Sequence, residues 1–185
     1  MMNDKIALFV DGGYLDKVLQ DEFSYARIDY EKLSKWMSNG VEIFRTYYYS
    51  CLPYQSDPPT KEESERFSGK QKFHYSLNQL PRFVVREGKL ELRGRNENGN
   101  PILVQKRVDI LLGADLVLLS TKQRITHAGI LTGDSDFLPA IEIAKNEGVL
   151  IHLFHSKQYF PHHDLWQMSD NRTVINYNVI KGMLR

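Results

Sequence analysis

The sequence predicts an α/β fold of three layers, in which helices cover both faces of a mainly parallel central sheet. The continuous apolar run at residues 6–10 is typical of a strand that is buried on both faces, and the largely apolar segments at 128–132 and 149–154 predict further strands. Helical segments alternate with these runs, and such alternation favours parallel strands joined by helices. The chain has 185 residues, of which 42% are hydrophobic, so it can bury one full core and a single domain over residues 1–185 is expected.

The first part of the chain is expected to form two strands and two helices. Glycines at 12–13 turn the chain after the first strand, and apolar side chains at helical spacing then predict a helix over 14–20. Asp29 is a favourable N-cap for a second helix over 30–38. The β-branched and aromatic run at 41–49 predicts the second strand.

A basic insertion is expected at about residues 60–105. It begins with a polar helix over 61–80. A hairpin over 82–93 follows, with its turn at the Glu-Gly pair 87–88, because such pairs favour tight turns between strands. The turn-rich stretch 94–101 then leads to the next helix.

The second half of the chain is expected to return to strand–helix alternation. An apolar helix, a buried strand, a capped helix and a further strand are predicted in this order at 107–120, 128–132, 136–146 and 149–154. Gly, Asp and Ser residues at 133–135 suit the start of the capped helix. A short helix near Leu165, a strand near 173–177 and a final short helix complete the order.

This topology predicts where a ligand would bind. Right-handed crossovers bring the carboxyl ends of parallel strands to one edge of the sheet, and α/β sheets bind ligands outside those ends. We therefore expect Asp11, the loop at 133–136 and the loop at 155–163 to converge at one edge.

Four carboxylates are candidates for a site at this edge. Asp11 follows the first strand, Asp134 and Asp136 follow the third, and Asp109 lies in the first turn of a helix. Each acid alone can be a turn residue or a helix cap. Together they would repel one another unless a cation lay among them, and oxygen-only ligands favour Mg²⁺ or Mn²⁺. All four are therefore predicted to be metal ligands and catalytic residues.

Two further residues are predicted to support the site. Ser135 stands between two of the acids. Asp115 lies in the apolar stretch LLGADLVLLS, where an unpaired carboxylate would be costly. Asp115 is therefore either a supporting carboxylate that orients its neighbours, or a core Asp paired with a backbone donor or with a Lys or Arg.

Three motifs resemble the NYN domain, a branch of the PIN-like nuclease superfamily: FVDGGYL, KRVDILLGADLV and LTGDSDFLPAIEIAKNEG, in that order. The resemblance covers about residues 5–155 and implies a Rossmann-like sheet, an acidic magnesium site and RNA cleavage. Position by position, the matching acids are Asp11, Asp109, Asp134 and Asp136, with Asp115 as the second helix acid. Tyr14 stands where the family often has Asn after the first strand.

Positive charge is concentrated in one segment. Residues 61–107 carry eleven Lys or Arg against six Glu, a net charge of +5, although the whole chain carries only +1. Phe and Tyr residues interleave with the basic ones, and this mixture suits single-stranded RNA, although a solvated helix and hairpin with core-facing aromatics would look the same. The predicted RNA contacts are Lys106, Arg107, Arg93, Arg95, Tyr14 and Lys157.

The sequence disfavours several other classes. Cys51 is the single cysteine, so an internal disulfide and a cysteine-rich zinc site are excluded. No apolar stretch approaches the roughly 20 residues that span a bilayer, and the N-terminal run is too short for a signal peptide. A cytoplasmic protein with no membrane partner is therefore expected. A haloacid-dehalogenase type of phosphatase fits poorly, because Gly13 occupies the position of its second Asp.

The predicted function is that of a metal-dependent ribonuclease, which hydrolyses RNA phosphodiester bonds through magnesium or manganese held by the Asp residues. The alternative is an NYN-fold RNA-binding or regulatory module with weak or no catalysis, and Tyr14 is the feature that favours it. RNA is the expected partner in both cases, and a homo-oligomer is left open.

Overall fold

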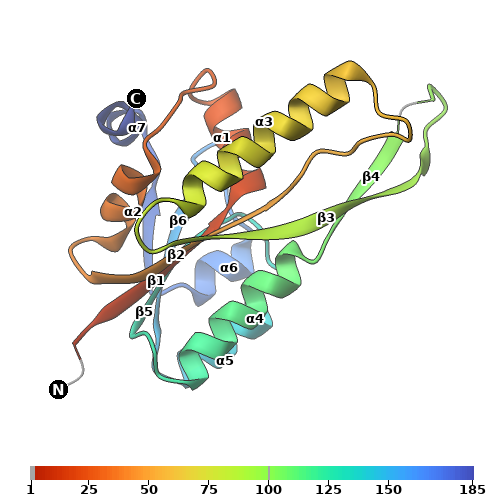
Figure 1. Cartoon of the computed structure of the whole chain (residues 1–185). Helices are drawn as coiled ribbons and strands as arrows, with labels where there is room; N and C mark the ends of the chain where they lie inside the picture. The colour runs from red at the N-terminus through yellow and green to blue at the C-terminus, as the bar shows by residue number, and fades with distance from the viewer. Residues whose placement is uncertain (1–2, 100) are drawn as a thin grey trace.

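Residues 3–99 and 101–185, which the computed structural model describes, fold around a seven-stranded sheet with helices on both faces (Figure 1). The strands are β1 (Lys5–Asp11), β2 (Glu42–Cys51), β3 (Phe83–Arg95), β4 (Pro101–Lys106), β5 (His127–Leu131), β6 (Leu150–His155) and β7 (Asn171–Val174). The helices are α1 (Gly12–Asp21), α2 (Tyr30–Ser38), α3 (Lys61–Asn78), α4 (Val108–Thr121), α5 (Leu138–Asn146), α6 (His163–Met168) and α7 (Tyr177–Met183).

The strand order is β4-β3-β2-β1-β5-β6-β7. Every neighbouring pair is parallel except β3 and β4, which are antiparallel. The predicted α/β class and the mainly parallel sheet are thus confirmed. Because β1 lies next to both β2 and β5, the carboxyl ends of these three strands meet at one edge.

Two buried clusters form the core, one on each face of the sheet. Alternate side chains of β1 enter different clusters: Phe9 packs with α4, α5 and α6, whereas Leu8 packs with α1, α2 and α7. Tyr47 and Tyr49 stack on Phe9 at ring-centroid distances of 5.7 and 6.5 Å. Burial on both faces explains why the β1 sequence is continuously apolar.

Several predicted boundaries shift. Helix α1 begins at Gly12 directly after β1, because the Asp11 carboxylate caps it by accepting a hydrogen bond from the Tyr14 backbone N–H at 3.1 Å. The two glycines thus belong to the first helical turn. Helix α5 begins at Leu138, two residues later than predicted, and β7 ends at Val174, before the predicted end. Helix α2 has the predicted bounds, with Asp29 as its N-cap.

The predicted hairpin turn at Glu87 and Gly88 is wrong. Strand β3 continues through both residues, pairing in parallel with β2 and then antiparallel with β4. Part of the true turn lies at 96–99, where Gly99 has a φ of +77°. Gly88 is needed for a different reason: a Cβ there would meet the Lys106 carbonyl oxygen at 2.7 Å and the Cys51 sulfur at 2.9 Å.

We expect the Gly88→Ala substitution to lower the free energy of unfolding by about 1–3 kcal/mol, since overpacking against backbone forces the strands apart. Chemical denaturation should measure this loss. Gly69→Ala is the matched control: it lies within α3 with open space around it, so the substitution should stabilise the protein by about 0.5–1 kcal/mol. Equal stabilities for wild type and Gly88→Ala would contradict the close packing of β3.

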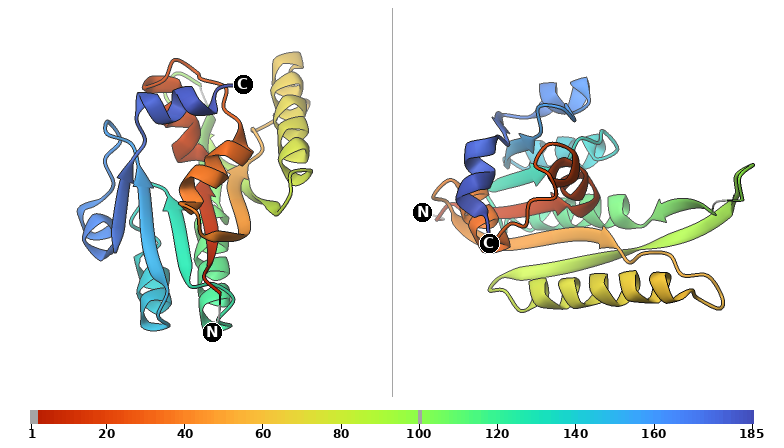
Figure 2. Two further views of the ribbon diagram at one scale, coloured as in Figure 1. Left: turned by 90° about the vertical axis from the view of Figure 1, so that its left-hand side faces the viewer. Right: turned by 90° about the horizontal axis from the view of Figure 1, so that it is seen from above.

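Helix α3 and the β3–β4 hairpin lie side by side and extend past the rest of the molecule (Figure 2). They comprise most of residues 60–105, and their description as an insertion into one domain stays a prediction. In the described part of the chain, no helix combines the length and the apolar character that crossing a membrane requires.

Candidate active site

The strand ends that meet at the sheet edge form a cleft of about 400 Å³. Its lining comes from three separate segments, which follow β1, β5 and β6. The lining residues are Asp11, Gly13, Tyr14, Lys17, Gly133, Asp134, Tyr159 and Phe160. The predicted convergence of the three segments at one edge is therefore confirmed.

Hydrogen bonds fix the position of the Asp11 carboxylate in this cleft. Its Oδ1 accepts from the Tyr14 N–H, and its Oδ2 accepts from the Thr132 hydroxyl at 3.1 Å. The same hydroxyl accepts a hydrogen bond from the Asp134 N–H at 3.3 Å. Thr132 thus joins the two acidic segments, and the sequence reasoning missed it although it begins the TGDSDF block.

The other two predicted acids, Asp109 and Asp136, are not part of the lining of this cleft. Asp109 and Asp136 line a groove of about 950 Å³ between α4 and α5, and Ser135 lines it with them. The Asp136 N–H donates to Asp134 Oδ1 at 3.0 Å, so the two acids belong to one tight turn. The four predicted carboxylates are therefore distributed over two adjoining depressions.

The charges of the four carboxylates nevertheless act on one another. Burial is the largest cause of the raised pKa of Asp109, and the charges of Asp134, Asp11 and Asp136 raise it further. The pKa of Asp11 is also raised, first by burial, although the hydrogen bonds from Tyr14 and Thr132 act against the rise. A cation near these acids would relieve the repulsion that contributes to both shifts.

The donor chemistry fits a divalent cation that keeps most of its water. Within residues 3–99 and 101–185, no three His, Cys, Asp or Glu side chains are spaced to hold one ion together. Mg²⁺ is usually bound through one or two carboxylates and retains several water ligands. Asp11 and Asp134 are two carboxylate residues that line the same cleft.

Asp115 forms an ion pair with Arg86. Its carboxylate accepts from Arg86 Nε and Nη2, both at 2.9 Å, and from the Tyr49 hydroxyl at 3.0 Å. Of the two predicted alternatives, the structure thus shows the Asp paired with an Arg. The pair joins α4 to β2 and β3, whereas a supporting role in catalysis stays a prediction.

Tyr14 anchors the loop that follows β6. Its hydroxyl donates to the Tyr159 carbonyl oxygen at 2.6 Å and accepts from the Ser156 N–H at 2.8 Å. Burial is the main reason why the pKa of Tyr14 rises to about 12. A Cβ at Gly133 would lie 2.8 Å from the Tyr14 ring, so the glycine of the TGDSDF block makes room for this ring. The Tyr14 hydroxyl is thus used in contacts within the protein, and RNA binding by Tyr14 stays a prediction.

Further contacts hold the same loop against α1. Ser156 Oγ donates to Glu22, the Tyr159 N–H donates to Ser156 Oγ at 2.8 Å, and the Tyr159 hydroxyl donates to Asp21. The Lys17 ammonium lies 4.3 Å from the centroid of the Tyr159 ring. Lys17, Tyr159 and Phe160 were not predicted. Lys17 could have been found, since it follows Asp11 by less than two helical turns.

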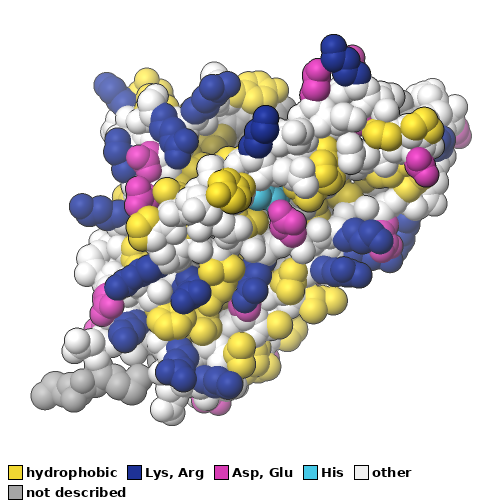
Figure 3. Space-filling model, viewed as in Figure 1, with side chains coloured by type: hydrophobic (Ala, Val, Ile, Leu, Met, Phe, Trp, Pro, Cys, Tyr) yellow, Lys and Arg dark blue, Asp and Glu magenta, His cyan; other side chains and the backbone are white. Residues whose placement is uncertain are grey.

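The predicted RNA-binding residues differ in the contacts that their charged groups make within the protein. Lys106 Nζ is 2.5 Å from Glu91, and Arg95 donates to the Gly99 carbonyl oxygen at 2.9 Å. Arg107, Arg93 and Lys157 are exposed. Figure 3 shows Lys and Arg side chains interspersed with acidic ones on the viewed face, so no continuous basic patch covers it.

The interleaved aromatic residues of the basic segment are largely structural. Phe73 packs against Tyr30 and Tyr48, and Phe83 is buried. Tyr75 is exposed on α3. The alternative in which the aromatic side chains face the core therefore describes most of this segment.

The chain thus has an α/β fold with a mainly parallel sheet covered by helices and a carboxylate-bearing cleft at the strand ends. The NYN domain profile matches residues 5–172, and the chain belongs to the NYN domain family. Membership implies a family of PIN-like nucleases, which generally use divalent metals and act on nucleic acid.

Two similar proteins are themselves without a known activity. A protein of unknown function from Vibrio parahaemolyticus, VPA0982, has a crystal structure that matches with a TM-score of 0.67 and 17% identity, over 99% of this chain and 97% of that chain. The uncharacterised protein y4oD of Sinorhizobium fredii is 41% identical over 49 residues, which are 26% of this chain and 23% of y4oD. The first likeness shows the fold, and the second spans about a quarter of the relative.

Proposed function

We propose that this protein is a metal-dependent ribonuclease that hydrolyses RNA phosphodiester bonds in the cleft at the sheet edge. The observation that carries the proposal is the meeting of Asp11 and Asp134 in one cleft, although 123 positions separate them in the sequence. Carboxylate oxygens are the ligands that Mg²⁺ and Mn²⁺ favour. The test is the loss of cleavage in the Asp variants described in the Discussion.

The residues of the cleft and of the adjoining groove have distinct roles in this proposal. Asp11 and Asp134 would hold the cation, and Thr132 keeps Asp11 oriented. A bound divalent cation supplies Lewis acidity and lowers the pKa of water, and both effects promote phosphodiester hydrolysis. Lys17 would neutralise a phosphate oxygen of the substrate. Asp109, whose pKa is raised by burial and by its acidic neighbours, would accept a proton more readily than an ordinary Asp.

An NYN-fold RNA-binding module with little catalysis is the second candidate. Two observations favour it: Tyr14 occupies the family's Asn position, and its hydroxyl is used to anchor a loop. Both candidates predict RNA binding, and only the first predicts cleavage that depends on Asp11. A cytoplasmic location, the choice between magnesium and manganese, and any homo-oligomer stay predictions.

We expect Mg²⁺ or Mn²⁺ to raise the melting temperature by roughly 5 °C at concentrations near a hundredfold over the Kd, since the ion binds only the folded state. Differential scanning fluorimetry should measure this shift. Asp11→Asn should reduce the shift and raise the melting temperature of the metal-free protein, because one repelling charge is gone. A melting temperature that is unchanged by millimolar metal would count against a metal site.

The metal effect should depend on pH with a definite sign. The pKa values of Asp11 and Asp109 are raised in the folded state, so ionising them lowers stability as pH rises from the unfolded pKa, about 4, through the folded value. The metal requires the ionised forms and relieves this cost. The metal-induced rise in melting temperature should therefore be larger at pH 8 than at pH 5, and the opposite order would contradict these carboxylates as ligands.

A further inference from the structure

Phe160 is an exposed aromatic side chain at the wall of the acidic cleft. It is 58% exposed, and it lines the cleft together with Asp11 and Asp134. Its sequence neighbour Pro161 is buried, and so is Leu165 in the helix that follows. The segment is therefore packed on both sides of Phe160, while the Phe160 ring itself stays open to solvent.

The rings of Trp166 and His155 pack against the Phe160 ring. The Trp166 ring lies at a centroid distance of 4.7 Å with 34° between the planes, so it covers one side of Phe160. The buried His155 ring meets Phe160 at 5.3 Å, nearly edge-on. The open side of the ring therefore stays available, and the ring cannot collapse onto the protein without breaking these contacts.

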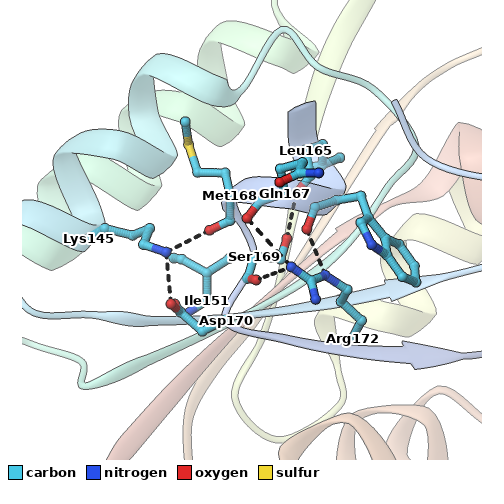
Figure 4. Close-up of polar contacts among 9 residues, drawn as sticks. Lys145, Ile151, Leu165, Gln167, Met168, Ser169, Asp170 and Arg172 are labelled. Carbon is cyan, nitrogen blue, oxygen red and sulfur yellow. Dashed lines mark hydrogen bonds and ion pairs between the residues drawn. The ribbon is translucent and has the colours of Figure 1, made fainter. Parts of the chain in front are cut away.

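Trp166 is held in turn by Arg172. The Arg172 guanidinium lies 5.0 Å from the centroid of the Trp166 ring, and its Nε donates to the Trp166 carbonyl oxygen at 2.6 Å. Figure 4 shows Arg172 reaching the carbonyl end of α6, where Nη2 also donates to the Ser169 carbonyl oxygen at 2.8 Å. On the other side of this segment, Lys145 donates to the Met168 carbonyl oxygen at 2.7 Å. The support of Phe160 is thus tied to β7 and to α5.

The backbone before Phe160 is equally fixed. The Tyr14 hydroxyl bridges the Ser156 N–H and the Tyr159 carbonyl oxygen, as described above. Tyr159 also bonds to α1 through its hydroxyl. A side chain that is already ordered loses little conformational entropy when a ligand binds, so the arrangement is preorganised.

We propose that Phe160 is a stacking platform for an unpaired nucleobase beside the scissile phosphate, and that it makes the cleft select single-stranded RNA. This inference rests on the proposed function. The open aromatic face would receive the base, Lys17 would meet a phosphate, and the carboxylates lie in the same cleft. Stacking on an aromatic side chain tolerates any base, whereas bases inside a duplex are already stacked on one another.

The test uses single-stranded RNA octamers that carry 2-aminopurine at one position at a time, bound in the presence of a chelator so that no metal-dependent cleavage occurs. Stacking on an aromatic ring quenches the 2-aminopurine fluorescence. Phe160→Leu removes the aromatic face but keeps an apolar side chain, and Phe160→Trp keeps the face. Tyr177→Leu is the control, because Tyr177 is 68% exposed on α7 and does not line the cleft.

Wild type should quench the probe at one position, and Phe160→Leu should lose the quenching and bind on the order of tenfold more weakly. Phe160→Trp and Tyr177→Leu should quench and bind as wild type does. Phe160→Leu and wild type should bind blunt duplex RNA with equal affinity. If Phe160→Leu also lowers the melting temperature, the quenching by wild type is compared with the quenching by Phe160→Trp instead. Loss of quenching in a stable Phe160→Trp protein would overturn the platform.

Equal binding and quenching by wild type and Phe160→Leu would also overturn it. The two proposals can fail separately. If Asp11→Asn cleaves RNA as fast as wild type while Phe160 still governs quenching, the nuclease proposal falls, and Phe160 remains a base-stacking platform for RNA binding alone. If wild type binds no RNA at all, both fall.

Discussion

Asp11→Asn and Asp134→Asn should each lower the rate of RNA cleavage in Mg²⁺ or Mn²⁺ by roughly 10²- to 10³-fold. Each change replaces a charged carboxylate that would bind the metal by a neutral amide of nearly the same shape. Asn at position 11 can still accept the hydrogen bond that caps α1, so the fold should survive. The loss should therefore appear in kcat far more than in RNA affinity, which could even rise because the repulsion of phosphate is reduced.

Asp4→Asn is the matched control for this experiment. Asp4 is exposed just before β1, at the end of the strand opposite to Asp11, so the same chemical change there should leave cleavage unaltered. Cleavage of single-stranded RNA should be followed by gel electrophoresis, with and without chelator. If wild type and Asp11→Asn show the same background cleavage on several RNA substrates, the nuclease reading is wrong and the RNA-binding module takes its place.

Tyr14→Asn shows how the structure changes an expectation drawn from the family pattern. Restoring the family's Asn would be expected to raise activity if Tyr14 only displaced a useful amide. The structure adds a second consequence, because the substitution also removes the hydroxyl that holds Ser156 and Tyr159. Tyr14→Phe separates the two effects: it removes the same hydroxyl without supplying an amide.

The fold and the meeting point of the acidic segments followed from local patterns. A continuous apolar run at residues 6–10 indicates a buried strand whatever its neighbours are, and parallel topology then brings Asp11 and the 133–136 loop to one edge. Asp29 was predictable as a cap for the same reason, since capping involves only the next few residues.

The errors came from contacts between residues that are distant in the sequence. Gly88 has the local signal of a turn, but the space it leaves is filled by Lys106 and Cys51 from other strands. The role of Tyr14 depends on Tyr159, 145 residues further along the chain. The aromatic side chains of the basic segment were ambiguous, because their spacing does not reveal that Phe73 faces Tyr48. Such contacts leave no periodic signal in a single sequence.

Reversing Arg93 and Arg95 to Glu should weaken binding of single-stranded RNA roughly tenfold or more at low salt, because two phosphate-neutralising charges become repulsive. Both residues are exposed on β3, and Arg93 is the freer one, since Arg95 also bonds to Gly99. Fewer counterions would be released on binding, so the slope of log affinity against log salt should fall in magnitude by about 1.4. Fluorescence anisotropy across a salt series should measure both quantities.

The matched control reverses Lys122 and Arg124 instead. These two residues are exposed between α4 and β5, at the edge of the sheet opposite to the cleft, and the change in net charge is the same. A general loss of positive charge would weaken RNA binding equally in both double variants, whereas a contact surface on the β3–β4 hairpin would affect only the first. The metal-induced rise in melting temperature should persist in both, because neither pair touches the carboxylates. If the affinity for RNA is unchanged by salt and by both pairs of reversals, the basic segment is a solvated surface. RNA must then be held by the cleft alone.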